Sequence, residues 1–348
     1  MSGEDGAPAA VVGPWLAERT GEPAWKDLTV ELISGGKSNL TYIVSSPAGE
    51  AVLRRPPTGH ILPTAHDMIR ESTVIGALGP TGFPVPAILA VEETGSLVGQ
   101  PFYVMERVLG HIIRAEMPAG YAETPAERHT IAERLIGTLA DLHAVDPASI
   151  GLGEFGRPTG YMERQVRRWT KQWDASRTQP SPELDALGAD LIAQVPAHSD
   201  ETIVHGDYRL DNTVLDAHDV GRVAAVLDWE MSTLGDPLAD LGLLLVYWAE
   251  SSDDQSGREG LTPSITGLEG FPDRDGVTQI YATASGRHVD NLPFYVAFGC
   301  FKLAVVVQGI IARVAGGAMG GQDFGPLEGS VSSLVGRGRR CLAEGVLG

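Results

Sequence analysis

His205-Gly-Asp-Tyr-Arg-Leu-Asp-Asn212 is the stretch that decides the fold, and Val226-Leu-Asp-Trp-Glu230 completes it. Apolar residues of buried-strand type lead into both segments. Each predicted strand therefore delivers polar side chains at its end, where carboxylates are costly to desolvate and need a partner. A hard cation with phosphate oxygens is one such partner, because Mg²⁺ is usually held by one or two carboxylates plus substrate phosphates.

The spacing of these polar residues sharpens the interpretation. Asp207 and Asn212 stand as D-x-x-x-x-N, and Asp228 follows on the next predicted strand. Phosphoryl transfer needs one group to orient the attacking hydroxyl and others to hold metal, and kinase catalytic loops present them in this order. A metal-dependent hydrolase is an alternative, but it would want further histidines at ligand spacing. The nine histidines are scattered, and none forms H-x-H or H-x-x-x-H.

The combined pattern resembles the aminoglycoside phosphotransferase family, whose members are kinase-like enzymes that act on small molecules. The resemblance rests on H-G-D-x-x-x-x-N, on the later D-W-E and on Gly235-Asp-Pro-Leu-Ala-Asp-Leu241. Protein kinases instead have His-Arg-Asp and Asp-Phe-Gly at the first two places. The D-W-E and G-D-P-L-A-D-L motifs also look similar to the branch sometimes fused to acyl-CoA dehydrogenase domains. The resemblance covers residues 28 to 313.

The resemblance implies an α+β, two-lobed protein-kinase-like fold. We expect a small N-terminal lobe with an antiparallel sheet, residues 1–108, and a larger, mainly helical C-terminal lobe, residues 109–348. The residues agree with this division. Short apolar or alternating runs separated by Gly and Pro predict an antiparallel meander in the first part. After Phe102–Glu106 the pattern turns helical, beginning with a capping box at Thr124.

A glycine-rich turn lies between the first two predicted strands. Small residues at Gly35, Gly36 and Ser38 allow backbone N–H groups to approach phosphates, although an ordinary glycine hairpin has the same composition. By its place, the turn resembles the nucleotide loop of the family. A Walker A motif is rejected, because Glu31 stands where its first glycine should be and a strand follows.

The resemblance also implies four further nucleotide-binding positions in the first lobe. Arg54 stands where the family usually has a lysine that pairs the nucleotide phosphates, and its neighbour Arg55 could take the role instead. Glu71, on a helix predicted to open at Thr64, is the expected partner of Arg54. Backbone groups at Glu106 and Val108 in the interlobe hinge would recognise the adenine.

The resemblance assigns the chemistry to the second lobe. Asp207 would orient the acceptor hydroxyl and accept its proton, and Arg209 could reach the transferring phosphoryl group. Asn212 and Asp228 would hold Mg²⁺, and Glu230 would add a metal contact directly or through water. Asp240 would support the loop through backbone hydrogen bonds. The expected function is transfer of the γ-phosphate of ATP or GTP to a hydroxyl of a small molecule.

The acceptor is expected to be aminoglycoside-type or a hydroxyacyl metabolite. Arg164, Arg168 and Lys171 share one face of a predicted helix. This face is either solvated or a site for an anionic part of the substrate, which would disfavour an aminoglycoside. Residues 250–275 and 316–325 are either lids or disordered segments. The alternative function is a nucleotide-binding, pseudokinase-like protein without turnover, suggested by the arginine at position 54.

Bulk properties set the expected partners and location. A formal charge of −19 over 348 residues argues against nucleic acid and anionic membranes as main partners. The two cysteines make no disulfide framework, and the N-terminus lacks the features of a signal peptide. The apolar run of residues 296–311 carries Lys302 and Gln308 and is expected to fall short of a membrane span. These features predict a cytoplasmic protein and leave its oligomeric state open.

Overall fold

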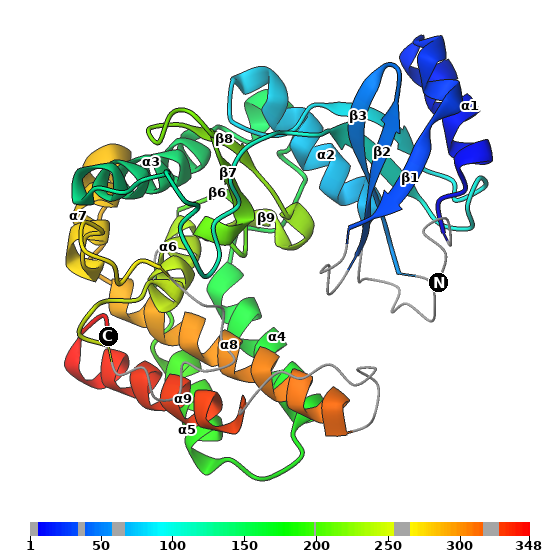
Figure 1. Ribbon diagram of the computed structural model, residues 1–348. Helices are drawn as coiled ribbons and strands as arrows, with labels where there is room; N and C mark the ends of the chain where they lie inside the picture. The colour runs from blue at the N-terminus through cyan, green and yellow to red at the C-terminus, as the bar shows by residue number, and fades with distance from the viewer. Residues whose placement is uncertain (1–5, 34–38, 58–66, 198–199, 254–264, 316–326) are drawn as a thin grey trace. The chain divides into compact units, whose positions relative to one another are not determined.

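The computed structural model describes residues 6–33, 39–57, 67–197, 200–253, 265–315 and 327–348. The chain forms two compact units (Figure 1). Residues 1–110 and 224–232 make the first unit, and residues 111–223 and 233–348 make the second. The sequence predicted that one domain ends at residue 108 and the next begins at residue 109, and this boundary stays a prediction. The units divide after Gly110, and a later segment of the chain groups with the first unit.

The first unit contains a five-stranded antiparallel sheet, as the sequence predicted (Figure 1). Its strands lie in the order β1-β2-β3-β5-β4. Their bounds are Thr29–Leu32 for β1, Leu40–Ser46 for β2, Gly49–Arg55 for β3, Ile88–Glu92 for β4 and Phe102–Glu106 for β5. The β2–β3 pairing sets Leu53 opposite Tyr42 and Arg54 opposite Thr41.

The alternation of side chains along β3 separates two layers of the first unit. On one face, Leu53 joins an apolar core with Val12 and Leu16 of α1 (Ala9–Thr20). On the other face, Arg54 meets α2 (Met68–Leu78). Helix α2 begins later than predicted, since Asp67 is its N-cap and accepts a hydrogen bond from Arg70 N. Thr64, where the sequence predicted the start, lies outside the described residues.

The segment that carries Asp-Trp-Glu is fastened to the first unit. It follows β8 (Val223–Val226) and forms the short 3₁₀ turn η5 (Trp229–Met231). Val226 N donates to Pro84 O at 2.8 Å, and the Trp229 ring meets the Phe83 ring edge-on at 5.9 Å. The motif is thereby built into the same unit as the five-stranded sheet.

The second unit is mainly helical, as predicted (Figure 1). A two-stranded antiparallel pair, β6 with β9, leads into the polar loops. The helices are α3 (Pro125–Ala144), α4 (Tyr161–Ser176), α5 (Pro182–Ala193), α6 (Pro237–Tyr247), α7 (Arg274–Ser285), α8 (Leu292–Ala315) and α9 (Leu327–Glu344), and the short strands are β6 (Thr202–Val204), β7 (Thr213–Leu215) and β9 (Thr233–Gly235). Short 3₁₀ turns of this unit are η3 (Ala148–Ile150) and η4 (Leu210–Asn212), and those of the first unit include η1 (Pro23–Asp27) and η2 (Gly79–Thr81).

Local sequence signals explain where these helices begin. Thr124 and Glu127 close the predicted capping box at the start of α3. Helix α6 begins before Asp240, because Asp236 is its N-cap and Pro237 occupies the first helical position. This start places Asp240 in the first turn of α6, with its carboxylate buried in the second unit.

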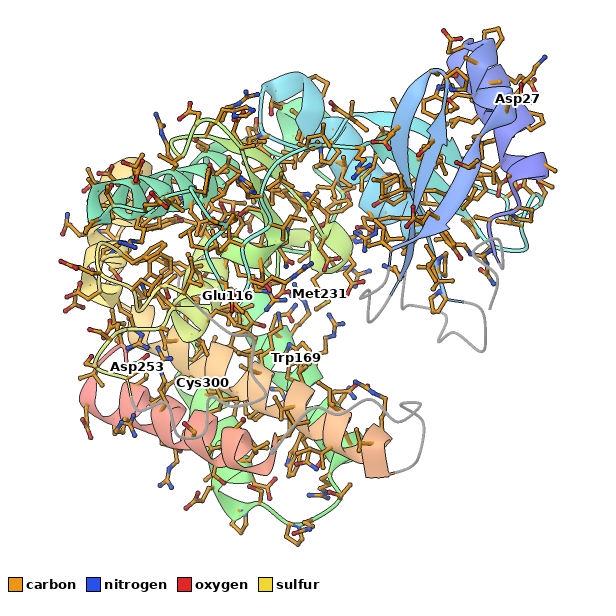
Figure 2. The ribbon with its side chains drawn as sticks, in the orientation of Figure 1. Asp27, Glu116, Trp169, Met231, Asp253 and Cys300 are labelled. Carbon is orange, nitrogen blue, oxygen red and sulfur yellow. The ribbon has the colours of Figure 1, made fainter. Side chains whose placement is uncertain are left out.

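Helix α8 is the centre of the second unit and packs against α4, α5, α6 and α9. By length and composition alone, its residues Leu292–Val314 could cross a membrane, so the expectation that this run falls short was wrong. Burial inside the protein covers 72% of its most apolar window, which is typical of a core helix. Cys300 of α8 (Figure 2) and Cys341 of α9 are buried free thiols.

Candidate functional site

Arg54 is the centre of a buried polar cluster in the first unit. Its Nη1 lies 2.6 Å from Glu71 Oε1, and its Nη2 lies 3.1 Å from Asp228 Oδ1. Arg55 points to the opposite face of the sheet, where it donates to the carbonyl oxygens of Gly6 and Pro56. Of the two arginines, Arg54 is therefore the partner of the helix glutamate.

Burial controls the protonation of this pair. Burial raises the pKa of Glu71 to about 7, although the nearby Arg54 charge acts in the opposite direction. Burial also disfavours the Arg54 cation, but Glu71, Tyr103 and Asp228 outweigh it and raise the pKa of Arg54. Arg54 thus remains a cation whose fork joins two carboxylates from distant parts of the sequence.

Asp228 has an unusual backbone conformation. Its φ of 67° and ψ of 60° lie in the left-handed region. Among the described non-glycine residues, Ala122 alone also has a positive φ. Such strain is typical of functional positions, where the surrounding structure holds it. The next acidic residue, Glu230, accepts a hydrogen bond from the buried Asn39 Nδ2 at 3.0 Å. Asn39, Arg54, Glu71, Asp228 and Glu230 together form the Arg54 cluster.

Polar side chains from the 205–212 loop and from α6 surround the Asp207 carboxylate in the second unit. Asp207 Oδ2 accepts from Asn212 Nδ2 at 3.1 Å, and Oδ1 accepts from Tyr247 OH at 3.3 Å. Arg209 Nε lies 3.4 Å from Oδ2 as an ion pair. Three side chains thus fix the orientation of the Asp207 carboxylate. The sequence had indicated Asn212 and Arg209, but not Tyr247.

Asn212 is oriented by its bonds to Asp207. The amide nitrogen donates to Asp207 O at 2.8 Å as well as to the carboxylate, so the oxygen Oδ1 is the atom that a cation would use. Within the described ranges, no three His, Cys, Asp or Glu side chains gather as a metal centre. A cation held by Asn212 or Asp228 would therefore take further ligands from phosphate or water, which suits Mg²⁺.

Arg209 is held between carboxylates and an aromatic ring. Its Nε lies 3.1 Å from Asp211 Oδ1, and its guanidinium carbon lies 4.7 Å from the centroid of the Tyr247 ring. A cation over a tyrosine face is an attractive contact that also restrains the side chain. The arrangement keeps a positive charge next to Asp207.

Asp240 supports the loop from below, in the manner that the resemblance implied. Its Oδ2 accepts from His205 N at 2.6 Å, and its Oδ1 accepts from Gly206 N at 2.7 Å. His143 Nε2 lies 3.3 Å from Oδ2. Burial alone would raise the pKa of Asp240, but the hydrogen bonds from the His143 ring and the His205 backbone help to lower it. Asp240 thereby stays anionic beneath the loop.

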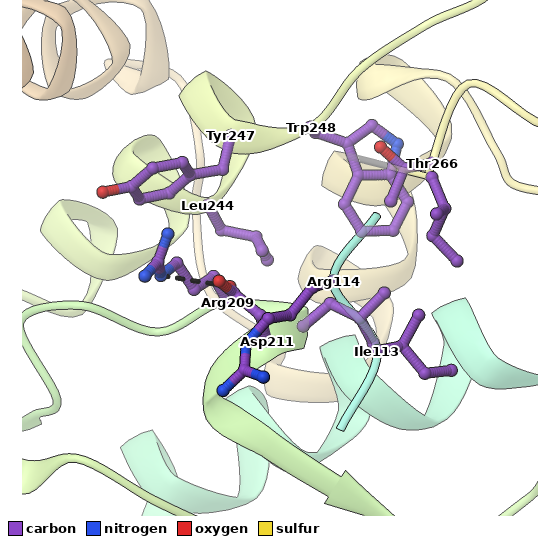
Figure 3. A pocket seen from close by; sticks show the side chains of 10 residues that line it. Ile113, Arg114, Arg209, Asp211, Leu244, Tyr247, Trp248 and Thr266 are labelled. Carbon is purple, nitrogen blue, oxygen red and sulfur yellow. Dashed lines mark ion pairs between the residues drawn. The ribbon is translucent and has the colours of Figure 1, made fainter. Parts of the chain in front are cut away.

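A small cavity of about 30 Å³ adjoins the loop (Figure 3). Arg209 and Asp211 form its polar side together with Arg114. Its other walls include Leu244, Tyr247 and Trp248 of the α6 end. Because Tyr247 also bonds to Asp207, the cavity lies beside the polar centre of the second unit.

The remaining predicted positions have different outcomes. Gly35, Gly36 and Ser38 lie outside the described residues. Glu106 ends β5, where its backbone N–H donates to Ala87 O at 2.8 Å, and Val108 follows it half-exposed. Asp228 and Glu230 belong to the first unit, whereas Asp207, Arg209 and Asn212 belong to the second.

The predicted basic face of α4 is exposed. Arg164, Arg168 and Lys171 all have exposed side chains. Arg164 donates to the carbonyl oxygens of Arg157 and Thr159, so its guanidinium supports the preceding turn. The Arg168 guanidinium carbon lies 5.7 Å from the centroid of the Trp169 ring.

Comparison with known proteins gives consistent matches along the chain. The model of a family described as phosphotransferase enzyme family matches residues 29–262. Acyl-CoA dehydrogenase family member 11 of Rattus norvegicus is 39% identical over 300 residues, covering 85% of this chain and 38% of the relative. Family member 10 of Mus musculus is 35% identical over 304 residues, covering 86% of this chain and 28% of the relative. The chain thus spans well under half of these relatives.

Solved structures match over nearly the whole chain. A Ralstonia eutropha protein classed as an aminoglycoside phosphotransferase is 32% identical, with a TM-score of 0.80, over 96% of this chain and 98% of that one. A choline kinase from Cryptosporidium parvum has a TM-score of 0.63 at 12% identity, over 96% of both chains. The second likeness concerns the fold alone, which is kinase-like.

Proposed function

The chain belongs to the phosphotransferase enzyme family, and we propose that it transfers the γ-phosphate of ATP or GTP to a hydroxyl of a small molecule. The observation that carries the proposal is the Asp207 carboxylate, held by Asn212 and Tyr247. A carboxylate fixed in this way can orient a hydroxyl and accept its proton.

The reaction assigned to the second unit is an in-line displacement. Asp207 accepts the proton of the acceptor hydroxyl while the acceptor oxygen forms a bond to the γ-phosphorus. The bond from that phosphorus to the bridging oxygen breaks, and the nucleoside diphosphate leaves with the electron pair. Arg209, which the carboxylates of Asp207 and Asp211 hold in place, supplies positive charge near the transferring group.

The metal ligands proposed for this reaction are Asn212 and Asp228, with Glu230 adding a contact directly or through water. Their oxygen atoms are the donors that Mg²⁺ prefers. When bound, Mg²⁺ would neutralise charge on the nucleotide phosphates. The amide nitrogen of Asn212 donates to Asp207 O, so its Oδ1 is the atom that would bind the metal.

The nucleotide is assigned to the first unit. Arg54 offers its charge to the phosphates, and Glu71 orients it. The proposal includes the backbone of Glu106 and Val108 at the adenine, and Gly35, Gly36 and Ser38 at the phosphates. Nucleotide binding is supported by a structure of similar fold, aminoglycoside phosphotransferase APH(4)-Ia, which was solved with AMP-PNP and hygromycin B.

A hydroxyacyl metabolite suits the acceptor side better than an aminoglycoside. The cavity beside Asp207 has walls from Leu244 and Trp248, and its polar side carries Arg114, Arg209 and Asp211. The cavity is about the size of one water molecule and does not hold an acceptor by itself. The apolar residues and Arg114 on this side of Asp207 suit an acceptor with an alkyl part and a negative group better than a polycation. The relatives named acyl-CoA dehydrogenase family members 10 and 11 support the same choice.

Calorimetric titration with ATP, and separately with GTP, tests the proposal. We expect binding that depends on Mg²⁺ and that Asp228→Asn weakens. The matched control is Asp27→Asn, which neutralises an exposed aspartate of η1 in the same unit (Figure 2). If the affinity changes neither with Mg²⁺ nor with Asp228→Asn, Asp228 is not part of the metal site. If the protein binds neither ATP nor GTP, the proposal is overturned.

A nucleotide-binding protein without turnover is the second candidate. Arg54 favours it, because the family usually has a lysine at this position. Single-turnover measurements with Mg-ATP separate the two candidates. Release of ADP at a rate that depends on Asp207 supports the phosphotransferase, and binding with no release supports the alternative.

A further inference from the structure

Lys302 is a lysine in the middle of the apolar core helix α8. An ammonium group in such surroundings is costly unless it finds a partner. Its Nζ donates to the carbonyl oxygen of Gly206 at 2.6 Å, in the residue directly before Asp207. The core helix of the second unit therefore reaches the 205–212 loop through one charged side chain.

The bond from Lys302 completes a set of restraints on two consecutive peptide groups. In the Gly206–Asp207 peptide, the carbonyl accepts from Lys302, and the N–H donates to His205 Nδ1 at 3.2 Å. In the preceding peptide, Gly206 N–H donates to Asp240 at 2.7 Å. Gly206 has a φ of 85°, which favours glycine, so the chain turns sharply at this point.

This geometry fixes the position of the Asp207 Cα atom. The orientation of a peptide plane determines where the next Cα atom and its side chain lie. Asp240 holds the plane before Gly206, but Lys302 is the side chain that holds the carbonyl of the plane after it. Without that bond, rotation about the Gly206 Cα–C bond can tilt this plane and move the Asp207 Cα atom. The bond from Asp207 N–H to His205 Nδ1 remains on the plane, and the Asp240 bonds remain before it.

An aromatic ring and two carboxylates partly offset the burial of the Lys302 ammonium group. Its Nζ lies 5.6 Å from the centroid of the Trp169 ring on α4 (Figure 2). Burial lowers the pKa of Lys302, while the charges of Asp207 and Asp240 raise it and those of Arg168 and Arg209 lower it. The two carboxylates thus offset part of the cost of burying the ammonium group.

We propose that Lys302 is a positioning residue for phosphoryl transfer, which holds the Gly206–Asp207 peptide so that the Asp207 carboxylate meets the acceptor. The inference rests on the proposed function. It gives α8 a role in the reaction beyond its role in the core, and none of the family motifs contains this lysine. A misplacement of about 1 Å at a reacting group can cost about 100-fold in rate.

The experiment compares Lys302→Met with Arg313→Met, which removes an exposed cation from the same helix. Methionine fills the space of the lysine stem but cannot donate to Gly206. With Mg-ATP and water as the acceptor, we expect kcat to fall about 10- to 100-fold in Lys302→Met, with KM for Mg-ATP within about twofold of wild type. Arg313→Met should match wild type in both constants.

Amide hydrogen exchange gives a readout independent of turnover. Lys302→Met should speed exchange in peptides covering residues 205–212 by about tenfold, with other parts of the second unit unchanged. If Lys302→Met does not fold, Lys302→Gln, which keeps a polar head group, carries the same comparison. Loop exchange and kcat equal to those of Arg313→Met would overturn the inference. A wild type without nucleotide turnover would instead defeat the proposed function, and loop exchange would still decide whether Lys302 holds the loop.

Discussion

Arg54 Nη1 lies 2.6 Å from Glu71 Oε1, and the other terminal nitrogen of the same guanidinium lies 3.1 Å from Asp228 Oδ1. A lysine at this position would present a point charge, whereas the planar fork of arginine reaches two carboxylates at once. The arginine therefore ties the Asp-Trp-Glu segment to the sheet of the first unit. This relationship gives the unusual residue a physical purpose and weakens the argument that it marks an inactive protein.

Removing the Arg54 charge should be strongly destabilising. Arg54→Met leaves the fully buried Glu71 carboxylate without its cation, and breaking a buried pair from one side costs about 3–5 kcal/mol. Urea unfolding at pH 8 measures the change in the free energy of unfolding. The control is Arg107→Met, which breaks the more exposed pair with Glu50 and should cost about 0–1 kcal/mol.

The penalty in Arg54→Met should shrink in acid. Burial raises the pKa of Glu71 to about 7 even beside Arg54. A carboxyl group whose folded pKa is raised binds more protons in the folded state, so stability rises as the pH falls through that pKa. Unfolding of Arg54→Met at pH 8 and at pH 5.5 therefore gives a smaller loss at the lower pH. A loss that is equal at both values would mean that Glu71 is not the group left unpaired.

Asp207→Ala should abolish transfer and spare nucleotide binding. General-base catalysis contributes about 10²- to 10⁴-fold, so kcat should fall within that range. Calorimetry should give a Kd for Mg-ATP close to that of wild type, because the nucleotide is assigned to the first unit. Asp174→Asn, an exposed aspartate of α4, is the control and should leave both values unchanged. Unchanged turnover in Asp207→Ala would remove this carboxylate from the mechanism.

The His143 ring should make the protein less stable as the pH falls below about 6.5. The ring lies 2.7 Å from Tyr281 OH through Nδ1 and 3.3 Å from Asp240 through Nε2. The carboxylate only accepts, so Nε2 carries the proton and Nδ1 accepts from the tyrosine. A second proton on Nδ1 would face that hydroxyl. Burial lowers the pKa of His143, although the Asp240 carboxylate opposes the effect.

The sign follows from proton uptake. Below the ordinary histidine pKa the unfolded chain binds a proton that the folded protein resists, so the free energy of unfolding falls by up to about 1.4 kcal/mol per pH unit. Urea unfolding of wild type and His143→Gln between pH 8 and pH 5.5 isolates this contribution. His129→Gln, at a more exposed position on α3, should keep the wild-type dependence. A steep dependence in His143→Gln would assign it to another group.

Much of the first unit could be predicted from the alternation of side chains along its strands. Alternation predicted the antiparallel sheet, and the same alternation explains why adjacent arginines serve opposite faces. The sequence left Arg54 and Arg55 as alternatives, because both follow the apolar run and only the packing of α2 distinguishes them. The start of α2 was misplaced for a related reason. Both Thr64 and Asp67 are good N-cap types, and a local pattern does not choose between them.

Local sequence patterns did not predict that side chains of the core helices contact the 205–212 loop. Tyr247 is the last residue of one apolar helix, and Lys302 lies within another. Helical periodicity therefore indicates only that both residues belong to core helices. Their contacts with Asp207 and Gly206 join residues 40 and 96 positions apart in the chain. Such contacts depend on how α6 and α8 pack, whereas the D-x-x-x-x-N spacing lies within one loop and could be read directly.

Tyr247→Phe should lower kcat about 2- to 10-fold, the range expected for losing one hydrogen bond of ordinary strength. Phenylalanine keeps an aromatic face under the Arg209 guanidinium but removes the donor to Asp207 Oδ1. Burial raises the pKa of Tyr247 well above its ordinary value, so the hydroxyl stays a neutral donor and the loss should be the same from pH 6 to pH 9. Steady-state rates with Mg-ATP measure it. Tyr121→Phe, which removes a hydroxyl that donates to Asp216 O in the same unit, is the control. Equal rates in the two variants would show that the bond to Asp207 has no part in orienting the carboxylate.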